Sequence, residues 1–192
     1  MPGTGPDFGE TVKVGRHEIE MAFKPEEARL LIFAYPDGRY RHEIASWSRL
    51  FLDENVICVV ERDTCVARNK AMRDFCMAAP PEIRHFVSID ADMRPEVART
   101  LPFLQADADL VGCMYPTTEH SLETWADSET VHVGPYRFNR KVVEAVKLPW
   151  FSWEPGLAGC QFVCECIGFL AKVRAAGLSV ARAGWCGHRD WR

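Results

Sequence analysis

The sequence lacks both a long apolar run and a strong excess of one charge. No stretch of eighteen apolar residues occurs among its 192 residues, so no membrane-spanning helix is predicted. The formal net charge is only −4, so attraction to a nucleic-acid backbone is not expected to drive binding. The first residues lack the basic start and apolar segment of an export signal, and we expect a soluble, cytoplasmic protein.

Internal repeats and low-complexity tracts are also missing, which favours one ordinary globular domain. Eight cysteines are present, but without an export signal we expect them to stay reduced and to form no structural disulfide. Residues 1–27 are rich in glycine and proline and then weakly alternating, which predicts a flexible N-terminal arm or an edge hairpin. The domain is expected to span residues 28–192.

Apolar runs typical of buried strands alternate with segments of helical character along most of the chain. The expected strands are 30–35, 56–60, 85–89, 110–115, 130–138 and 178–183. The expected helices are 44–52, a helix capped by Asp63 or Thr64 and running toward Ala79, one opened by Pro95, a short one capped by Asn139, and one containing Phe162, Cys166, Leu170 and Val173 that stops at Gly177. This alternation predicts an α/β fold with a mostly parallel sheet flanked by helices.

The strongest functional signal is Asp90-Ala91-Asp92, directly after the strand His85–Ile89. Ligands of open α/β sheets bind beyond the carboxyl ends of strands. Two carboxylates at such an end can hold a hard divalent cation such as Mn²⁺ or Mg²⁺ through oxygen. That cation would neutralise the diphosphate released by a nucleotide-sugar. Taken alone, the pattern is more often a solvated loop or a helix cap, and its place after an apolar strand is what favours a metal site.

The order of several short segments resembles that of glycosyltransferases with the GT-A fold, in particular family 2-like enzymes and their short phage-type relatives. The segments are Tyr35-Pro36, Val66-Ala67-Arg68-Asn69-Lys70-Ala71, Phe86–Met93, Asp109-Leu110-Val111-Gly112 and Gly187-His188. Together they extend over roughly Leu30 to Trp191. The resemblance implies a single GT-A-like domain and a transferase, with an inverting reaction expected.

The resemblance also implies roles for particular residues. Pro36 would lie against the base of the nucleotide, and Arg68 and Asn69 would lie near the nucleotide or position the loops around it. Within Asp90-Ala91-Asp92, Asp92 would bind the metal, and Asp90 would contact the ribose or share the metal. His188 would supply a further metal ligand. For Arg68 and Asn69, an exposed polar helix surface is an equal alternative.

The segment around Glu165-Cys166 resembles the part of these enzymes that carries a catalytic carboxylate facing the acceptor. The aspartate that commonly serves as the base is absent here, because Cys166 follows Glu165. Glu165 is then the base, or the reaction is retaining and needs none, or the protein binds donor without transfer. We favour Glu165 as the base, since an acceptor hydroxyl must lose its proton as it attacks. A helix-capping role for Glu165 is the alternative.

Two further hypotheses concern aromatic and cysteine residues. Trp150 and Trp153 could stack on an acceptor, although aromatic rings are at least as often part of a core. The set Cys160, Cys164, Cys166, Cys186 and His188 could bind zinc, but its spacing is unlike that of structural zinc sites.

The sequence therefore predicts a metal-dependent glycosyltransferase that uses a nucleotide-diphosphate sugar, with a UDP-sugar as the favoured donor. The acceptor is not specified and could be a protein, a glycan or a modified nucleic acid. One alternative is a catalytically silent sugar-nucleotide-binding protein. Another is a sugar nucleotidyltransferase, which the single glycine in Tyr35-Pro36-Asp37-Gly38 disfavours.

Overall fold

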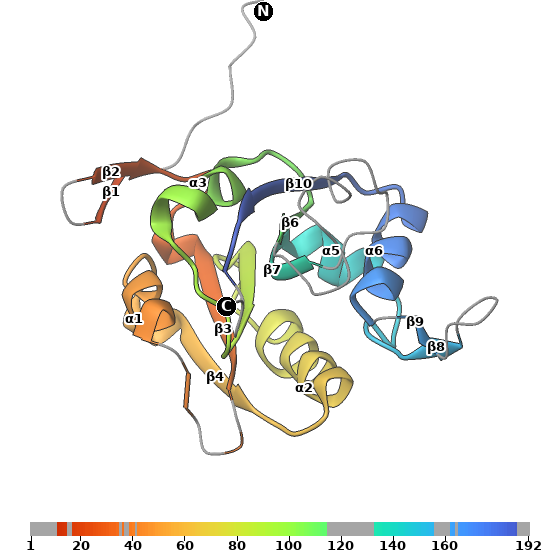
Figure 1. Ribbon diagram of the computed structural model, residues 1–192. Coiled ribbons are helices and arrows are strands. Elements are labelled where there is room, and N and C mark those ends of the chain that lie inside the picture. Colours follow the sequence, from red (N-terminus) through yellow and green to blue (C-terminus); the bar gives the residue numbers. More distant parts are fainter. Residues whose placement is uncertain are drawn as a thin grey trace, which may run out of the picture.

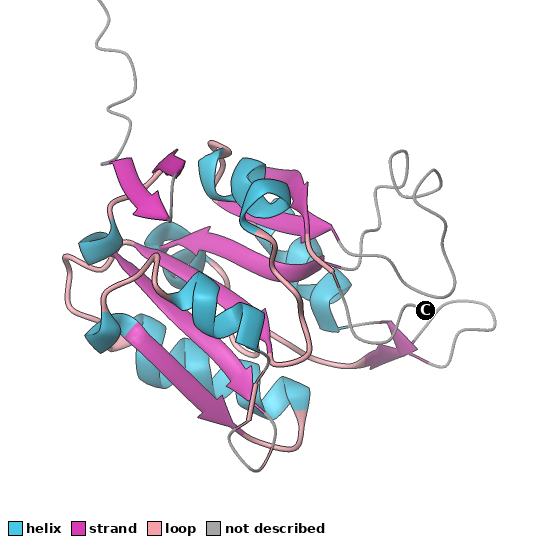
Figure 2. Cartoon of the chain, turned by 60° about the vertical axis from the view of Figure 1, so that its left-hand side comes forward, coloured by secondary structure: helices cyan, strands magenta, loops and turns pink. Residues whose placement is uncertain are grey.

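A computed structural model describes residues 11–14, 17–34, 36, 39–40, 42–114, 133–155, 162–163 and 165–187. Its centre is a six-stranded sheet with helices on both faces (Figures 1 and 2). The α/β architecture expected from the sequence is confirmed.

The strands of this sheet are β3 (Ala28–Ala34), β4 (Val56–Val60), β5 (His85–Asp90), β6 (Leu110–Met114), β7 (Val133–Asn139) and β10 (Val180–Trp185). The α-helices are α1 (His42–Ser48), α2 (Thr64–Ala71), α3 (Val97–Gln105), α5 (Arg140–Ala145) and α6 (Glu165–Ala175). Shorter helical segments are η1 (Pro25–Glu27), η2 (Asp53–Asn55) and the π-helix η3 (Met72–Met77). Two small antiparallel pairs lie apart from the main sheet: β1 (Thr11–Val14) with β2 (His17–Glu20), and β8 (Glu154–Pro155) with β9 (Phe162–Val163).

The strand order is β10-β6-β7-β5-β3-β4. β3 pairs in parallel with both β4 and β5, and β6 pairs in parallel with β10. β7 lies between β5 and β6 and runs antiparallel to both. The five other strands therefore point the same way, and their carboxyl ends meet at one edge of the sheet.

β3 is buried on both faces, as its continuous apolar run predicted. Leu31 packs into one core cluster with residues of α2, η3, α5 and α6. Leu30 and Ile32 pack into a second cluster on the other face, with residues of α1 and α3. Both faces of β3 are therefore covered by helices.

Local capping explains where several helices begin and end. The Asp63 carboxylate accepts a hydrogen bond of 2.8 Å from the backbone N–H of Val66 at the start of α2. The Asn139 side chain accepts one from Val142 at the start of α5. After α6 the chain turns through Gly177, whose φ is +75°. All three signals were expected from the sequence.

Three expectations differ from the structure in detail. The last helix was expected to include Phe162, but Phe162 belongs to strand β9 and α6 begins at Glu165. Pro95 does not open α3, because Glu96 is its N-cap and Val97 its first residue. The packed core also begins before residue 28, since Met21 and Phe23 are 1% and 2% exposed.

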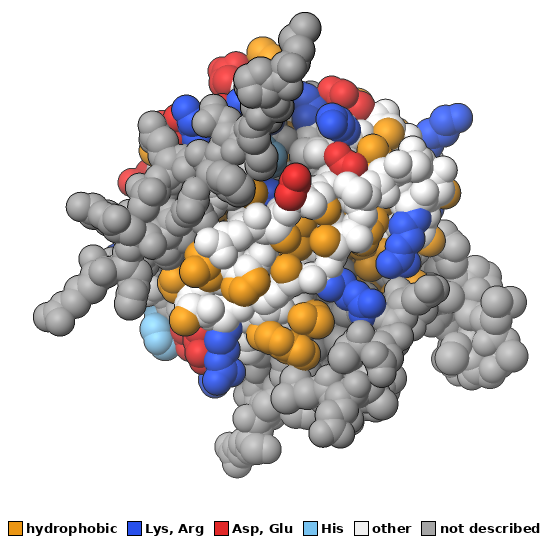
Figure 3. All heavy atoms as spheres, turned by 90° about the horizontal axis from the view of Figure 1, so that it is seen from above, with side chains coloured by type: hydrophobic (Ala, Val, Ile, Leu, Met, Phe, Trp, Pro, Cys, Tyr) orange, Lys and Arg blue, Asp and Glu red, His pale blue; other side chains and the backbone are white. Residues whose placement is uncertain are grey.

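No helix in the described part of the chain is both long and apolar enough to cross a membrane. Acidic and basic side chains are interspersed on the face seen in Figure 3, with no broad field of one sign. This agrees with the small formal net charge of −4.

Alanine substitution of Gly184, compared with that of Gly177, tests how closely β10 packs against α3. Both glycines have positive φ, but a Cβ at Gly184 would lie 2.9 Å from the carbonyl oxygen of Arg99, whereas one at Gly177 would meet nothing within 4 Å. Gly184→Ala should therefore lower the free energy of unfolding by about 3 kcal/mol or more. Gly177→Ala, the matched control, should cost only about 1 kcal/mol of backbone strain. Equal losses in denaturant unfolding would contradict the close approach.

Candidate functional site

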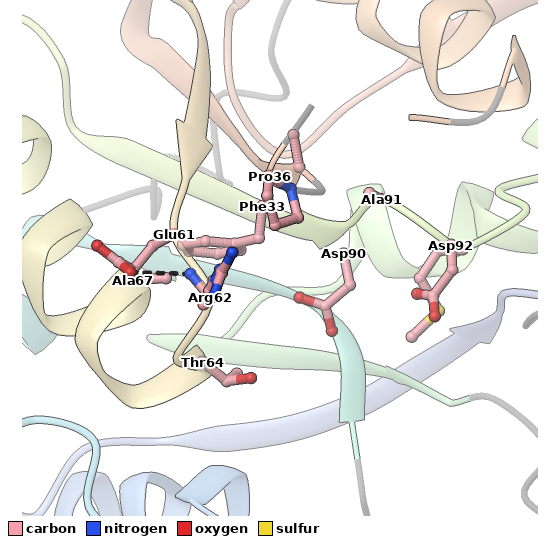
Figure 4. Close-up of a pocket in the computed structure, with 11 residues that line it drawn as sticks. Phe33, Pro36, Glu61, Arg62, Thr64, Ala67, Asp90, Ala91 and Asp92 are labelled. Carbon is pink, nitrogen blue, oxygen red and sulfur yellow. Dashed lines mark hydrogen bonds between the residues drawn. The ribbon is translucent and has the colours of Figure 1, made fainter. Parts of the chain in front are cut away.

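Asp90 ends β5, and the turn after it is fixed to the neighbouring strand. The backbone N–H of Ala91 donates to the carbonyl of Phe33 in β3 (2.9 Å), and that of Met93 donates to the carbonyl of Asp90 (3.1 Å). Ala91 is 3% exposed, so its methyl group faces the core. Figure 4 shows Asp90 and Asp92 extending to the same side of this turn. The turn thus presents two carboxylates together.

A cleft of about 440 Å³ lies over the carboxyl ends of β3, β4 and β5. Its lining residues come from β3 and β5, from the segments after β3, β4 and β5, and from the start of α2: Phe33, Ala34, Pro36, Glu61, Arg62, Thr64, Ala67, Asp90, Ala91, Asp92 and Met93. Four of the residues proposed from the sequence as donor-binding, Pro36 and the Asp90-Ala91-Asp92 set, therefore line one cavity.

Glu61 and Arg62 form the wall opposite the two aspartates (Figure 4). The Arg62 backbone N–H donates to the Glu61 carboxylate at 2.8 Å, which fixes the direction of that side chain. Neither residue was predicted from the sequence to belong to the site. The signal was available, because they follow β4 directly and the carboxyl ends of parallel strands share one edge.

Arg68, on α2, lies beneath the cleft and joins two carboxylates. Its Nη2 donates to both oxygens of Asp90 at 2.9 Å, and its Nη1 donates to Oε1 of Glu165 at 3.1 Å. Arg68 is 5% exposed, as is Glu165, so this is a buried network rather than a surface ion pair. The guanidinium connects the end of β5 with the start of α6, segments that are distant in sequence.

Aromatic rings surround the same guanidinium. Its carbon lies 5.5 Å from the ring centroid of Phe33 and 5.7 Å from those of Tyr136 and Phe151, within the range of cation–π attraction. Burial alone would lower the pKa of Arg68, but the neighbouring carboxylates raise that pKa above its ordinary value. Arg68 is therefore a permanent cation held in a closely packed environment.

Asn69 fixes the backbone of the aromatic segment that follows α5. Its Nδ2 donates to the carbonyls of Phe151 (2.7 Å) and Cys65 (2.8 Å), and its Oδ1 accepts from the N–H of Phe151 (3.2 Å). Neither Arg68 nor Asn69 is among the described residues that line the cleft. Of the two roles weighed for this pair, their contacts favour positioning of surrounding segments over contact with the nucleotide.

The two tryptophans proposed for the acceptor differ in exposure. Trp150 is 2% exposed and belongs to the core, so the acceptor role proposed for it is replaced by the core alternative. Trp153 is 51% exposed, so it is still a candidate for stacking on an acceptor. Cys166, which follows Glu165, is 3% exposed and packs in the same core cluster as Trp150.

The C-terminal segment is held beside the aspartate turn. Arg94 and Gly187 exchange two backbone hydrogen bonds, from Arg94 N–H at 2.7 Å and from Gly187 N–H at 3.0 Å. A Cβ at Gly187 would lie 3.1 Å from that of Arg94, so the close pairing favours glycine. His188, the third metal ligand proposed from the sequence, lies outside the described residues.

The chemistry of the donor set fits a hard divalent cation. Asp90 and Asp92 offer carboxylate oxygens to the same cleft, which is what such cations prefer. Within the described residues no group of three or more His, Cys, Asp or Glu side chains converges, so a protein-only site would need a ligand from elsewhere. Mg²⁺-type ions are commonly held by one or two carboxylates together with substrate phosphates.

Two of the cysteines proposed as zinc ligands lie too far apart to share one ion. Cys166 and Cys186 are both buried, but they belong to core clusters on opposite faces of the sheet. They therefore do not converge on one ion. Cys160 and Cys164, like His188, lie outside the described residues.

No protein-family model and no curated protein matches this chain. Among solved structures, A197 from STIV is similar over 82% of this chain and 83% of its own, with a TM-score of 0.52 and 15% identity. A candidate nucleotide-diphospho-sugar transferase from Desulfovibrio desulfuricans is similar over 86% of this chain and 83% of its own (TM-score 0.46, 14% identity). A Drosophila β1,4-galactosyltransferase 7 in complex with manganese, UDP-Gal and xylobiose covers 81% of this chain and 65% of its own (TM-score 0.46, 13% identity). The likeness to A197 concerns the fold alone, and it agrees with the α/β architecture described above.

Asn69→Ala tests the positioning role of this side chain. The substitution leaves the buried backbone groups of Phe151 without their partner, which should lower the free energy of unfolding by about 1–3 kcal/mol. Hydrogen exchange at the Phe151 amide should become faster. Ser46→Ala removes a hydrogen bond on the exposed surface of α1 and serves as the control, with an expected loss below about 0.5 kcal/mol. Unchanged exchange at Phe151 would rule out this role for Asn69.

Proposed function

We propose that this chain is a metal-dependent glycosyltransferase that moves a monosaccharide from a nucleotide-diphosphate sugar to an acceptor hydroxyl. The observation that carries the proposal is the shared cleft, in which Asp90 and Asp92 face the segments after β3 and β4. Carboxylates at the carboxyl edge of a mostly parallel sheet are placed where such folds bind ligands. The proposed enzyme is of the GT-A type, and the favoured donor is a UDP-sugar.

Each wall of the cleft would contact a different part of the nucleotide-sugar or its metal. Phe33 and Pro36 offer an apolar surface against which a nucleotide base would pack. Glu61 and Arg62, on the facing wall, supply one acceptor and one cation for polar groups of the nucleotide. Asp92 and Asp90, with His188, would hold Mn²⁺ or Mg²⁺, and a bound cation would neutralise the charge that develops on the diphosphate leaving group.

Glu165 remains the proposed acceptor of the proton from the attacking hydroxyl. It stands at the start of α6, where the helix dipole stabilises a carboxylate, and Arg68 holds one of its oxygens. Trp153 is the proposed acceptor contact, because an exposed indole can stack on a sugar or a base. The chemical class of the acceptor is left open by these residues.

A catalytically silent sugar-nucleotide-binding protein is the second candidate. Two observations favour it: Glu165 is 5% exposed, and the residue after it is a buried thiol in place of a carboxylate. This candidate shares the donor cleft and differs only in turnover. Donor binding and transfer must therefore be measured separately.

Asp92→Asn tests the metal-dependent donor site. A ligand that binds only the native state raises the unfolding temperature, so the correct nucleotide-sugar should stabilise the wild-type protein in the presence of Mn²⁺. Asp92→Asn should abolish this stabilisation with little change in the fold, because the residue lies in a turn beyond the strand end. Asp53→Asn, which alters a carboxylate in η2, is the control and should bind normally.

His188→Ala should weaken the same effect less than Asp92→Asn, since the two anionic ligands remain. Undiminished Mn²⁺-dependent binding by Asp92→Asn would remove the metal assignment. A larger effect at His188 than at Asp92 would mean that nitrogen or sulfur ligands organise the site.

Glu165→Gln separates the transferase from the silent binder. At saturating Mn²⁺ and donor, turnover should fall by about 10²- to 10⁴-fold, because the amide keeps the size of the side chain but does not take up the proton. Glu144→Gln on the exposed surface of α5 is the matched control. Transfer that survives Glu165→Gln would exclude Glu165 as the base, and donor binding without any transfer by the wild-type protein would favour the silent binder.

A further inference from the structure

Arg68 is buried, charged and in contact with both halves of the site, yet it lies outside the cleft. Two hydrogen bonds of 2.9 Å from one nitrogen fix both oxygens of Asp90, and the other nitrogen reaches Glu165 at 3.1 Å. The side chain of Asp90 is 29% exposed, whereas those of Arg68 and Glu165 are 6% and 7% exposed. Asp90 is thus the only one of the three with a substantial surface toward the cleft.

The geometry leaves Asp90 few orientations. A carboxylate whose two oxygens are held by one guanidinium cannot rotate freely about its last bond, and the guanidinium is itself fixed among the rings of Phe33, Tyr136 and Phe151. Each oxygen has a second lone pair that remains available to a ligand in the cleft. Groups that orient a metal-binding carboxylate in this way commonly change metal affinity 10- to 100-fold when they are replaced.

We propose that Arg68 is a positioning residue that orients Asp90 for a divalent cation and ties that orientation to Glu165. The donor-side and acceptor-side carboxylates then share one counterion and act as one unit. The inference rests on the proposed function, because it assumes that a cation binds at Asp90 and Asp92. It adds a role for a residue that is not among those lining the cleft.

The charge on Arg68 means that its two possible effects on Mn²⁺ affinity have opposite directions. By electrostatics alone, a cation next to the site repels Mn²⁺, so removing it would tighten Mn²⁺ binding. If Arg68 orients Asp90, removing it loosens Mn²⁺ binding instead. Lysine keeps the charge but, as a compact ammonium, cannot hold two carboxylates in the geometry of the guanidinium fork.

The experiment measures the affinity of the full chain for Mn²⁺ alone, by electron paramagnetic resonance of the free ion. Arg68→Lys should bind Mn²⁺ at least about tenfold more weakly than wild type. Arg68→Met should also bind more weakly, against the electrostatic expectation. Arg140→Lys is the matched control, because the guanidinium of Arg140 also donates several hydrogen bonds, to backbone carbonyls, and lies 5.8 Å from an aromatic ring centroid, that of Phe86, but contacts neither aspartate. Its Mn²⁺ affinity should equal that of wild type.

A double-mutant cycle tests the tie to Glu165. Glu165→Gln should weaken Mn²⁺ binding in the wild-type background and weaken it less in the Arg68→Lys background, because the connection to Asp90 is already broken. Equal effects in both backgrounds would overturn the coupling.

The outcomes separate this inference from the proposed function. Asp92-dependent Mn²⁺ binding that survives Arg68→Lys unchanged overturns the role of Arg68 and leaves the proposed function in place. Equal losses in Arg68→Lys and Arg140→Lys would also overturn it, since they would reflect general loosening of the protein. If wild type does not bind Mn²⁺, the proposed metal site fails, and the positioning role fails with it.

Discussion

The buried ion pairs of Arg68 with Asp90 and Glu165 hold the parts of this site together. Taking a charge out of water is costly unless it is paired and hydrogen-bonded, and here two carboxylates and three aromatic rings provide that environment. The arrangement requires β3, β5, β7, α2 and α6 to lie in their observed positions at once. Removing Arg68 would take this counterion from the buried carboxylate of Glu165, so the network constrains the fold as well as the site.

The sheet topology explains why the cleft lies where it does. β3, β4 and β5 are parallel neighbours, so the segments that follow them emerge together and supply Pro36, Glu61, Arg62 and Asp92. The antiparallel strand β7 separates this group from β6 and β10 and carries Tyr136 toward Arg68. Asp90 ends β5 of this sheet and Glu165 begins helix α6, and Arg68 lies between them.

Much of this could be predicted from local sequence, because strand ends and helix caps depend on nearby residues. The run Leu30–Ala34, the cap at Asp63 and the carboxylates after β5 were expected for that reason. The burial of Arg68 could not be predicted in the same way, since its partner Glu165 is 97 residues away and an arginine on a short helix normally faces solvent. Trp150 and Phe162 were misplaced because aromatic residues fit a core, a strand or a binding surface equally well.

We propose that Asp90 and Asp92 hold a divalent cation together with the diphosphate of a nucleotide in the cleft of β3, β4 and β5. The most direct measurement is anomalous X-ray diffraction at the manganese absorption edge from crystals of the full chain grown with MnCl₂ and a nucleotide diphosphate. We expect an anomalous peak within coordination distance of the Asp92 carboxylate, with the diphosphate on its far side and the base against Phe33 and Pro36. A nucleotide bound elsewhere, or a manganese peak remote from both aspartates, would contradict it.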